Sequence, residues 1–115
     1  MRVLLTNDDG IDAPGIATLQ KAIAPHAREV VTVAPQTQMS ECGHRFTVYA
    51  PIPVEQRTKN AYAVAGTPAD CTRLGLTQFA ADVDWVLSGV NAGGNLGVDI
   101  YTSGTVAAVR EATIL

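Results

Sequence analysis

The sequence contains few of the residues that stabilise small secreted proteins or attract nucleic acids. Only two of its 115 residues are cysteines, Cys42 and Cys71, and they form neither a CxxC pair nor a disulfide framework. Lysine and arginine number 8 against 11 aspartate and glutamate residues, which gives a net charge of −3. Because this balance provides no basic face, we expect no binding of long nucleic acid.

Long apolar runs and targeting segments are missing as well. No uninterrupted apolar stretch approaches the roughly 20 residues of a membrane span. The N-terminus runs directly into Val3-Leu4-Leu5, without the charged lead and small-residue cleavage site of a signal peptide. We therefore expect no membrane association and a cytoplasmic location.

Two common nucleotide-binding motifs are also absent. The sequence has no GxxxxGK[ST] motif, and no GxGxxG motif follows its first apolar run. Neither an NTPase nor a dinucleotide-dependent enzyme is supported. The 47% of hydrophobic residues nevertheless predicts a packed core, and the length predicts a single domain over residues 1–115.

Short apolar runs alternate with helical patterns along the chain. This alternation predicts an α/β fold whose central strands are parallel, with a short antiparallel region in the middle of the chain. We predict buried strands over 1–7, 29–34 and 84–88, short strands over 45–49, 54–57 and 62–64, and helices from Pro14, from Pro68 to about Ala80, and over 107–115.

The loops that follow the three buried strands carry most of the polar residues of interest. In parallel sheets, ligands bind beyond the carboxyl ends of the strands. We therefore expect the loops Asn7–Gly10, Gln36–Gly43 and Gly89–Gly104 to meet at one edge of the sheet.

Asp8 and Asp9 are adjacent in a turn that ends at Gly10. Neighbouring residues within a strand point to opposite faces, so both carboxylates can aim at one point only in a turn of this kind. Two crowded carboxylates repel each other, and a cation between them relieves the repulsion. The alternative is an ordinary surface turn, because Asn-Asp-Asp-Gly is also common turn chemistry.

Ser40 and Asn91 lie in the second and third loops. With Asp8 and Asp9 they would form an all-oxygen ligand set, which suits Mg²⁺ or Mn²⁺ better than zinc. A loop serine or asparagine on its own is usually solvated or part of a turn. Neither His26 nor His44 is expected to be a ligand.

Ser103, Gly104 and Thr105 come just before the last apolar helix. Backbone amides at a helix start, together with two hydroxyl groups, can bind a phosphate. The simpler alternative is a serine that caps the helix, with glycine providing freedom of the backbone.

Five motifs follow one another along the chain: Leu5–Ile11, Ala34-Pro35 with Ser40, Gly66–Cys71, Ser88–Gly93 with Asn95 and Gly97, and Ser103–Val106. Taken together and in this order, they resemble the SurE family of survival proteins over the whole chain. The resemblance implies a Rossmann-like three-layer α/β/α sandwich and a metal-dependent phosphatase, a nucleotidase that acts on nucleoside 5′- and 3′-monophosphates.

The resemblance also implies roles for individual residues. It makes Asp8, Asp9, Ser40 and Asn91 the ligands of one divalent cation, Mg²⁺ or Mn²⁺. Our own hypothesis is that Asp8 or Asp9 also acts as the catalytic base that accepts a proton from water; the sequence does not choose between them. The resemblance further implies that four residues help to hold the phosphate of the substrate: Asn95, Ser103, Gly104 and Thr105. The Gly66–Cys71 segment is expected to be structural, with Asp70 as a helix-start carboxylate.

Family members are about twice as long, so we expect this chain to be a truncated, N-terminal portion. The half that it lacks would complete the pocket and support homo-oligomers, either dimers or tetramers. One alternative is therefore an inactive remnant that binds metal and nucleotide and needs a completing chain. A signalling receiver domain is a poor alternative, because Lys21 and Lys59 are the only lysines and neither follows a buried strand. The base preference and the choice between 5′ and 3′ phosphates stay open.

Overall fold

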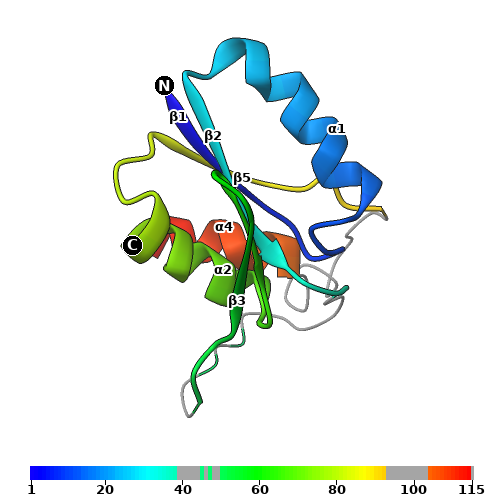
Figure 1. Ribbon diagram of the computed structural model, residues 1–115, viewed down its shortest axis with the longest axis vertical. Helices are drawn as coiled ribbons and strands as arrows, with labels where there is room; N and C mark the ends of the chain where they lie inside the picture. The colour runs from blue at the N-terminus through cyan, green and yellow to red at the C-terminus, as the bar shows by residue number, and fades with distance from the viewer. Residues whose placement is uncertain (39–44, 46, 48–49, 93–103, 115) are drawn as a thin grey trace.

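A five-stranded sheet, with strand order β3-β4-β2-β1-β5, forms the centre of the molecule (Figure 1). The computed structural model describes residues 1–38, 45, 47, 50–92 and 104–114. Strands β1, β2, β4 and β5 run parallel to one another, and β3 pairs antiparallel with β4. The strands are β1 (Arg2–Thr6), β2 (Glu29–Pro35), β3 (Val54–Thr58), β4 (Ala61–Val64) and β5 (Trp85–Ser88).

Helices cover both faces of this sheet, which makes a three-layer α/β/α arrangement (Figure 1). Helix α1 (Pro14–Ile23) lies on one face, and its end continues into the short helix η1 (Ala24–His26). Helices α2 (Pro68–Leu74) and α4 (Gly104–Ile114) lie on the other face, and a π-helical turn over Gly75–Phe79 extends α2. The predicted α/β fold is therefore confirmed.

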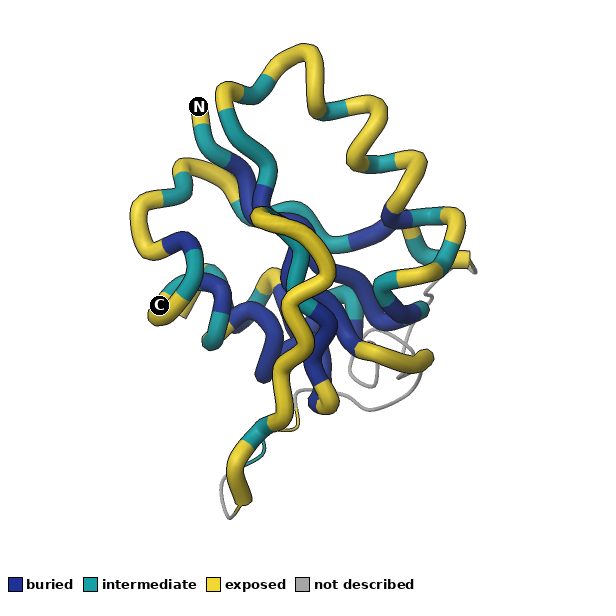
Figure 2. Tube along the Cα trace, viewed as in Figure 1, coloured by how far each residue is buried: buried dark blue, intermediate teal, exposed yellow. Residues whose placement is uncertain are grey.

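The core is divided by the sheet into two clusters. Val3 and Leu5 point toward α1 and pack with Ile16, whereas Leu4 lies between them in sequence and packs with Val33 and other residues on the α2 face. This alternation follows from the two-residue period of a strand. Figure 2 shows most of β1 and β2 buried, with the largely exposed α1 on one face and the largely buried α2 on the other. The apolar run at the N-terminus is thus buried because helices cover it on both sides.

Strand β5 is less buried than the sequence predicts. We expected a fully buried third strand, but Trp85 is 60% exposed, and Val86 and Leu87 are only half-buried. The reason is topological: within the described residues, β5 pairs only with β1 and so forms an edge of the sheet. An apolar composition does not distinguish an edge strand from a central one.

Helix α2 begins with a capping box that also holds a neighbouring segment. The side chain of Thr67 accepts a hydrogen bond from the Asp70 backbone amide, and the Asp70 carboxylate accepts one from the Thr67 amide. The helix-start role predicted for Asp70 is confirmed. Asp70 also accepts hydrogen bonds from the amide and hydroxyl of Thr47. Of the strand predicted over 45–49, the structure describes only Arg45 and Thr47, and neither lies in a strand.

Cys71 is fully buried in α2 and is not in a disulfide, whereas Cys42 lies outside the described residues. His26 ends η1 at an exposed position, and His44 also lies outside the described residues.

Among the residues that the structure describes, no helix is long and apolar enough to cross a membrane.

Candidate metal and phosphate site

The carboxyl ends of β1, β2 and β5 lie side by side, because these three strands are parallel neighbours in the sheet. Asp8 and Asp9 follow β1, residues 36–38 follow β2, and Asn91 follows β5. The first predicted loop therefore meets residues 89–92, the described beginning of the third, and residues 36–38, the described beginning of the second, adjoin it. Ser40, in the rest of the second loop, lies outside the described residues.

The turn after β1 is organised by Asn7, a residue whose role we did not predict. Its side chain is fully buried; the amide group donates to the Gly10 carbonyl at 2.8 Å, and its oxygen accepts from the Gly10 amide at 3.3 Å. Gly10 has φ of +105°, a conformation that favours glycine. A side chain there would also approach the Thr37 backbone. Together these contacts fix the direction in which Asp8 and Asp9 leave the strand.

Asp8 is the more buried member of the acidic pair, with only 5% of its surface exposed. Its Oδ1 atom is buried and has no hydrogen-bond partner among the described residues. Burial raises the pKa of this carboxyl, and the charge of Asp9 raises it further, while hydrogen bonds from Thr105 partly offset the rise. An ordinary surface turn would leave Asp8 solvated, so the alternative of a plain turn does not describe this residue.

Asp9 connects the turn after β1 to the loop after β5. Its Oδ2 atom accepts a hydrogen bond of 2.9 Å from the Ala92 amide, and this bond holds the neighbouring Asn91 beside the acidic pair. The hydroxyl of Thr105 makes a long 3.5 Å contact with Asn91 Oδ1, and Thr105 also hydrogen-bonds Asp8. The structure thus brings Asp8, Asp9, Asn91 and Thr105 together from three separate parts of the chain.

The start of α4 faces the buried carboxylate of Asp8. Gly104 is buried, and Thr105 in the first turn hydrogen-bonds Asp8 through its side chain and its backbone. The exposed amides of a helix start carry a partial positive charge, which favours an anion there. Gly104 and Thr105, both predicted to hold a phosphate, therefore lie at the start of α4 beside Asp8. Asn95 and Ser103, which share that prediction, lie outside the described residues.

Two hydroxyl groups next to the acidic pair were not singled out in the sequence. Thr6 and Ser88 are register partners at the ends of β1 and β5, and each has a buried hydroxyl oxygen without a partner among the described residues. Gly15 was also missed: a side chain at this position of α1 would overlap the Val90 carbonyl. The absence of a side chain lets α1 approach the loop that carries Asn91.

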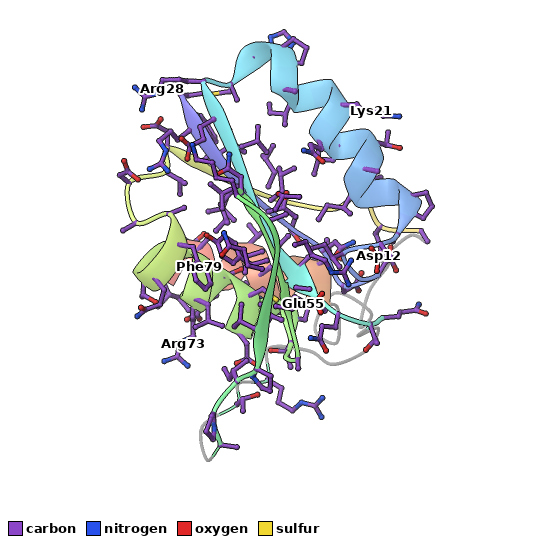
Figure 3. All side chains as sticks on the ribbon, viewed as in Figure 1. Asp12, Lys21, Arg28, Glu55, Arg73 and Phe79 are labelled. Carbon is purple, nitrogen blue, oxygen red and sulfur yellow. The ribbon has the colours of Figure 1, made fainter. Side chains whose placement is uncertain are left out.

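Asp12 follows the same turn but is directed elsewhere. Its carboxylate accepts a hydrogen bond of 2.8 Å from Arg57 on β3, and both side chains are exposed (Figure 3, Asp12). Arg57 also pairs with Glu55 on the same strand. Both ion pairs lie on the surface beside α1. On that side, no cationic side chain among the described residues pairs with Asp8 or Asp9.

The donor set of the site fits a hard divalent cation. Asp8 and Asp9 offer carboxylate oxygens, Asn91 offers an amide oxygen, and the unpaired Oδ1 of Asp8 is a buried acceptor that such an ion would satisfy. No group of three or more His, Cys, Asp or Glu side chains suited to a metal occurs in the described part of the chain. A site whose ligands are all oxygen atoms, two of them from carboxylates, suits Mg²⁺ or Mn²⁺.

A family model described as survival protein SurE matches residues 3–115. The chain belongs to the SurE family. A protein from Synechocystis sp. is 63% identical over 115 residues, and a Clostridium beijerinckii protein named 5′-nucleotidase SurE is 44% identical over 99% of the chain. The crystal structure of SurE from Aquifex aeolicus has a TM-score of 0.92 and 42% identity, and it matches 99% of the chain.

The matches cover only part of each relative. The chain spans 50% of the Synechocystis protein, 47% of the Clostridium protein and 47% of the Aquifex structure. The prediction that this chain corresponds to the N-terminal portion of a SurE protein is therefore confirmed, and so is the Rossmann-like α/β fold.

Proposed function

We propose that this chain is the metal- and phosphate-binding half of a 5′-nucleotidase, a phosphatase that hydrolyses nucleoside monophosphates to nucleoside and phosphate. The observation that carries the proposal is the buried Asp8 carboxylate, whose free oxygen lies beside Asp9, Asn91 and the start of α4. The names of several relatives, 5′-nucleotidase SurE, support the reaction class.

Asp8, Asp9 and Asn91, with Ser40 from the second loop, would hold one Mg²⁺ or Mn²⁺ ion. Such an ion, when bound, neutralises charge on a phosphoryl oxygen and lowers the pKa of a coordinated water. The chain's own contribution is mainly positioning, since phosphoryl transfer requires alignment and charge stabilisation more than covalent chemistry. Asn7 and the Ala92 amide hold the acidic pair in place.

The start of α4, where Thr105 hydrogen-bonds Asp8, would bind the phosphate next to the acidic pair and its cation. The Gly104 amide and the Thr105 donors, released from Asp8, would bond the phosphate, and Asn95 and Ser103 would complete the set. Asp8 or Asp9 accepts the proton of the attacking water. Burial raises the pKa of the Asp8 carboxyl before any cation binds.

Phosphate release from nucleoside 5′- and 3′-monophosphates, measured with Mn²⁺, with Mg²⁺ and with a chelator, tests the proposal. We expect hydrolysis that depends on the metal, and we expect Asp9→Asn to lose most of the turnover and to bind Mn²⁺ at least about tenfold more weakly. Asp12→Asn is the matched control, because Asp12 lies in the same loop but pairs with Arg57. Metal-independent hydrolysis, or equal losses in both variants, would contradict the assignment.

A second candidate is binding without turnover. The chain spans about half the length of the relatives it matches, so residues of the other half can be required for hydrolysis. In that case calorimetry would show binding of Mn²⁺ and nucleotide with no phosphate release. Adding the second half of a relative as a separate chain should then restore activity.

Association with a second copy, or with the other half of a relative, is also proposed. Exposed apolar side chains lie on β5 and on α4: Trp85, Val109 and Ile114 are 60%, 44% and 73% exposed. Exposed apolar surface of this kind favours association. Gel filtration should show a species larger than a monomer, and replacement of Trp85 by lysine should shift it toward the monomer.

A further inference from the structure

A cavity of about 390 Å³ lies between the start of α1 and the loop after β5. Asp9 and Asn91 form part of its wall, and both belong to the candidate metal site. The cavity is therefore a continuation of that site on the α1 side of the acidic pair. Its described lining residues are Asp9, Ala13, Pro14, Gly15, Thr18, Gln38, Val90, Asn91 and Ala92.

The wall of this cavity is mostly apolar. Val90 is 51% exposed, and Pro14 at the first position of α1 is exposed as well, so apolar surface faces solvent beside a polar site. Gln38 and Asn91 add side-chain amides, which both donate and accept hydrogen bonds. A concave apolar surface with a few polar groups is the usual composition of a small-molecule site.

The charges on the two sides of Asp9 differ. None of the described residues that line the cavity is a lysine, arginine or histidine, and its one charged residue is Asp9. An anion is therefore unfavourable in the cavity. On the other side, the start of α4 with Gly104 and Thr105 favours an anion. A substrate with a charged end and a neutral end would thus place the charged end toward α4.

We propose that this cavity receives the nucleoside of a nucleoside monophosphate while the phosphate faces α4. This inference deepens the proposed function and rests on it for the identity of the ligand. The volume lies in the range of about 300–1,000 Å³ that small-molecule pockets have. A base can lie against the apolar surface of Pro14 and Val90, and the amides of Gln38 and Asn91 can bond its polar edge or the ribose.

The first experiment uses nucleosides without phosphate. Adenosine, guanosine, cytidine and uridine are each titrated into ¹⁵N-labelled chain with a chelator present, so that no metal contributes. We expect at least one of them to shift the amide signals of Gly15 and Ala92. The indole signal of Trp85, which lines a separate groove, should stay in place. No shift with any nucleoside, or shifts centred on Trp85, would overturn the proposal.

The second experiment fills the cavity. Side chains on a helix lean toward its N-terminus, so Phe at position 18 would extend over Pro14 and Gly15. Thr18 is exposed, which allows the larger side chain without disturbing the core. Thr18→Phe should weaken the binding of the nucleoside by at least about tenfold, since it occupies the apolar contact surface.

Ala22→Phe is the matched control. Ala22 is also exposed, lies one helical turn further along α1 and does not line the cavity. It should bind nucleosides as the unchanged chain does. Equal weakening in both variants, or no weakening by Thr18→Phe, would overturn the proposal.

These outcomes are separable from those of the proposed function. Nucleoside binding is measured without metal and without hydrolysis, so it reports on the cavity even if the chain releases no phosphate. Conversely, metal-dependent hydrolysis of a nucleotide together with unshifted Gly15 and Ala92 signals would keep the function and reject the cavity as the nucleoside site.

Discussion

Replacement of Asp70 by alanine would test how α2 is joined to the segment around Thr47. The Asp70 carboxylate is 1% exposed and accepts three hydrogen bonds: from the Thr67 amide at 3.0 Å, from the Thr47 amide at 2.9 Å and from the Thr47 hydroxyl at 2.7 Å. No other carboxylate in the described residues is shown to connect two segments through so many donors. Alanine removes all three acceptor contacts at once.

The expected loss can be assembled from these contacts. The half of the capping box that is lost is the bond from the Thr67 amide, which would be left buried without a partner at a cost of about 1–3 kcal/mol of stability. Thr47 is half-buried, so its donors can turn to water, and their loss costs about 1 kcal/mol or less. We therefore expect Asp70→Ala to lower the free energy of unfolding by about 1–4 kcal/mol.

Urea denaturation followed by circular dichroism measures this loss, provided that the slope m is unchanged between the two proteins. Thr47→Val is the control, because it removes one donor and keeps the branched shape; it should cost about 1 kcal/mol or less. The double variant should show a coupling energy of about 0.5–1 kcal/mol between the two positions, because Thr47→Val removes only the hydroxyl donor. A loss below about 0.5 kcal/mol for Asp70→Ala would refute the reasoning, since surface changes commonly produce that much.

Three further predictions follow from other contacts. Gly15→Ala should destabilise the chain by up to about 2 kcal/mol in the same assay, because overlap with the Val90 carbonyl outweighs the helix propensity gained; an increase in stability would contradict the contact. Asp8→Asn should stabilise the metal-free chain at neutral pH, because burial raises the pKa of Asp8 and so penalises its ionised form. A carboxyl whose pKa is raised in the folded state makes the chain less stable as pH rises. The gain in stability from Asp8→Asn should therefore vanish below pH 3.8, the ordinary pKa of the carboxyl, and urea midpoints measured across pH would show this loss. Cys71, with no exposed surface, should react with a thiol reagent only after unfolding, as mass spectrometry of the peptide would report.

Much of the fold could be predicted because its signals are local. The apolar run of Val3, Leu4 and Leu5 is too short for a buried helix and leads directly into a turn, so a buried strand was the natural interpretation. Pro14 and Pro68 each begin a helix, as proline at a first helical position does. The alternation of strands and helices then leaves few topologies other than a parallel sheet with helices on both faces.

The position of a strand within the sheet was not predictable in the same way. Trp85-Val86-Leu87 has the composition of a central strand, yet β5 lies at an edge in the described structure. Burial depends on what packs on each side, and that information is not contained in the strand itself. The change from α- to π-helical winding after Leu74 was missed for a similar reason, since no local signal in Gly75–Phe79 distinguishes the two.

The sequence by itself determined which polar groups follow the first strand and precede the last helix: two adjacent carboxylates in a turn, and a glycine with hydroxyl residues. Only the tertiary structure decided that Asp8 is buried and lacks a partner for Oδ1, that Ala92 binds Asp9, and that Thr105 reaches Asp8 from the far end of the chain. The physical reason is that residue types fix which bonds a side chain can make. Which bonds it does make depends on neighbours that the fold supplies from almost a hundred residues away, as it does for Asp8 and Thr105.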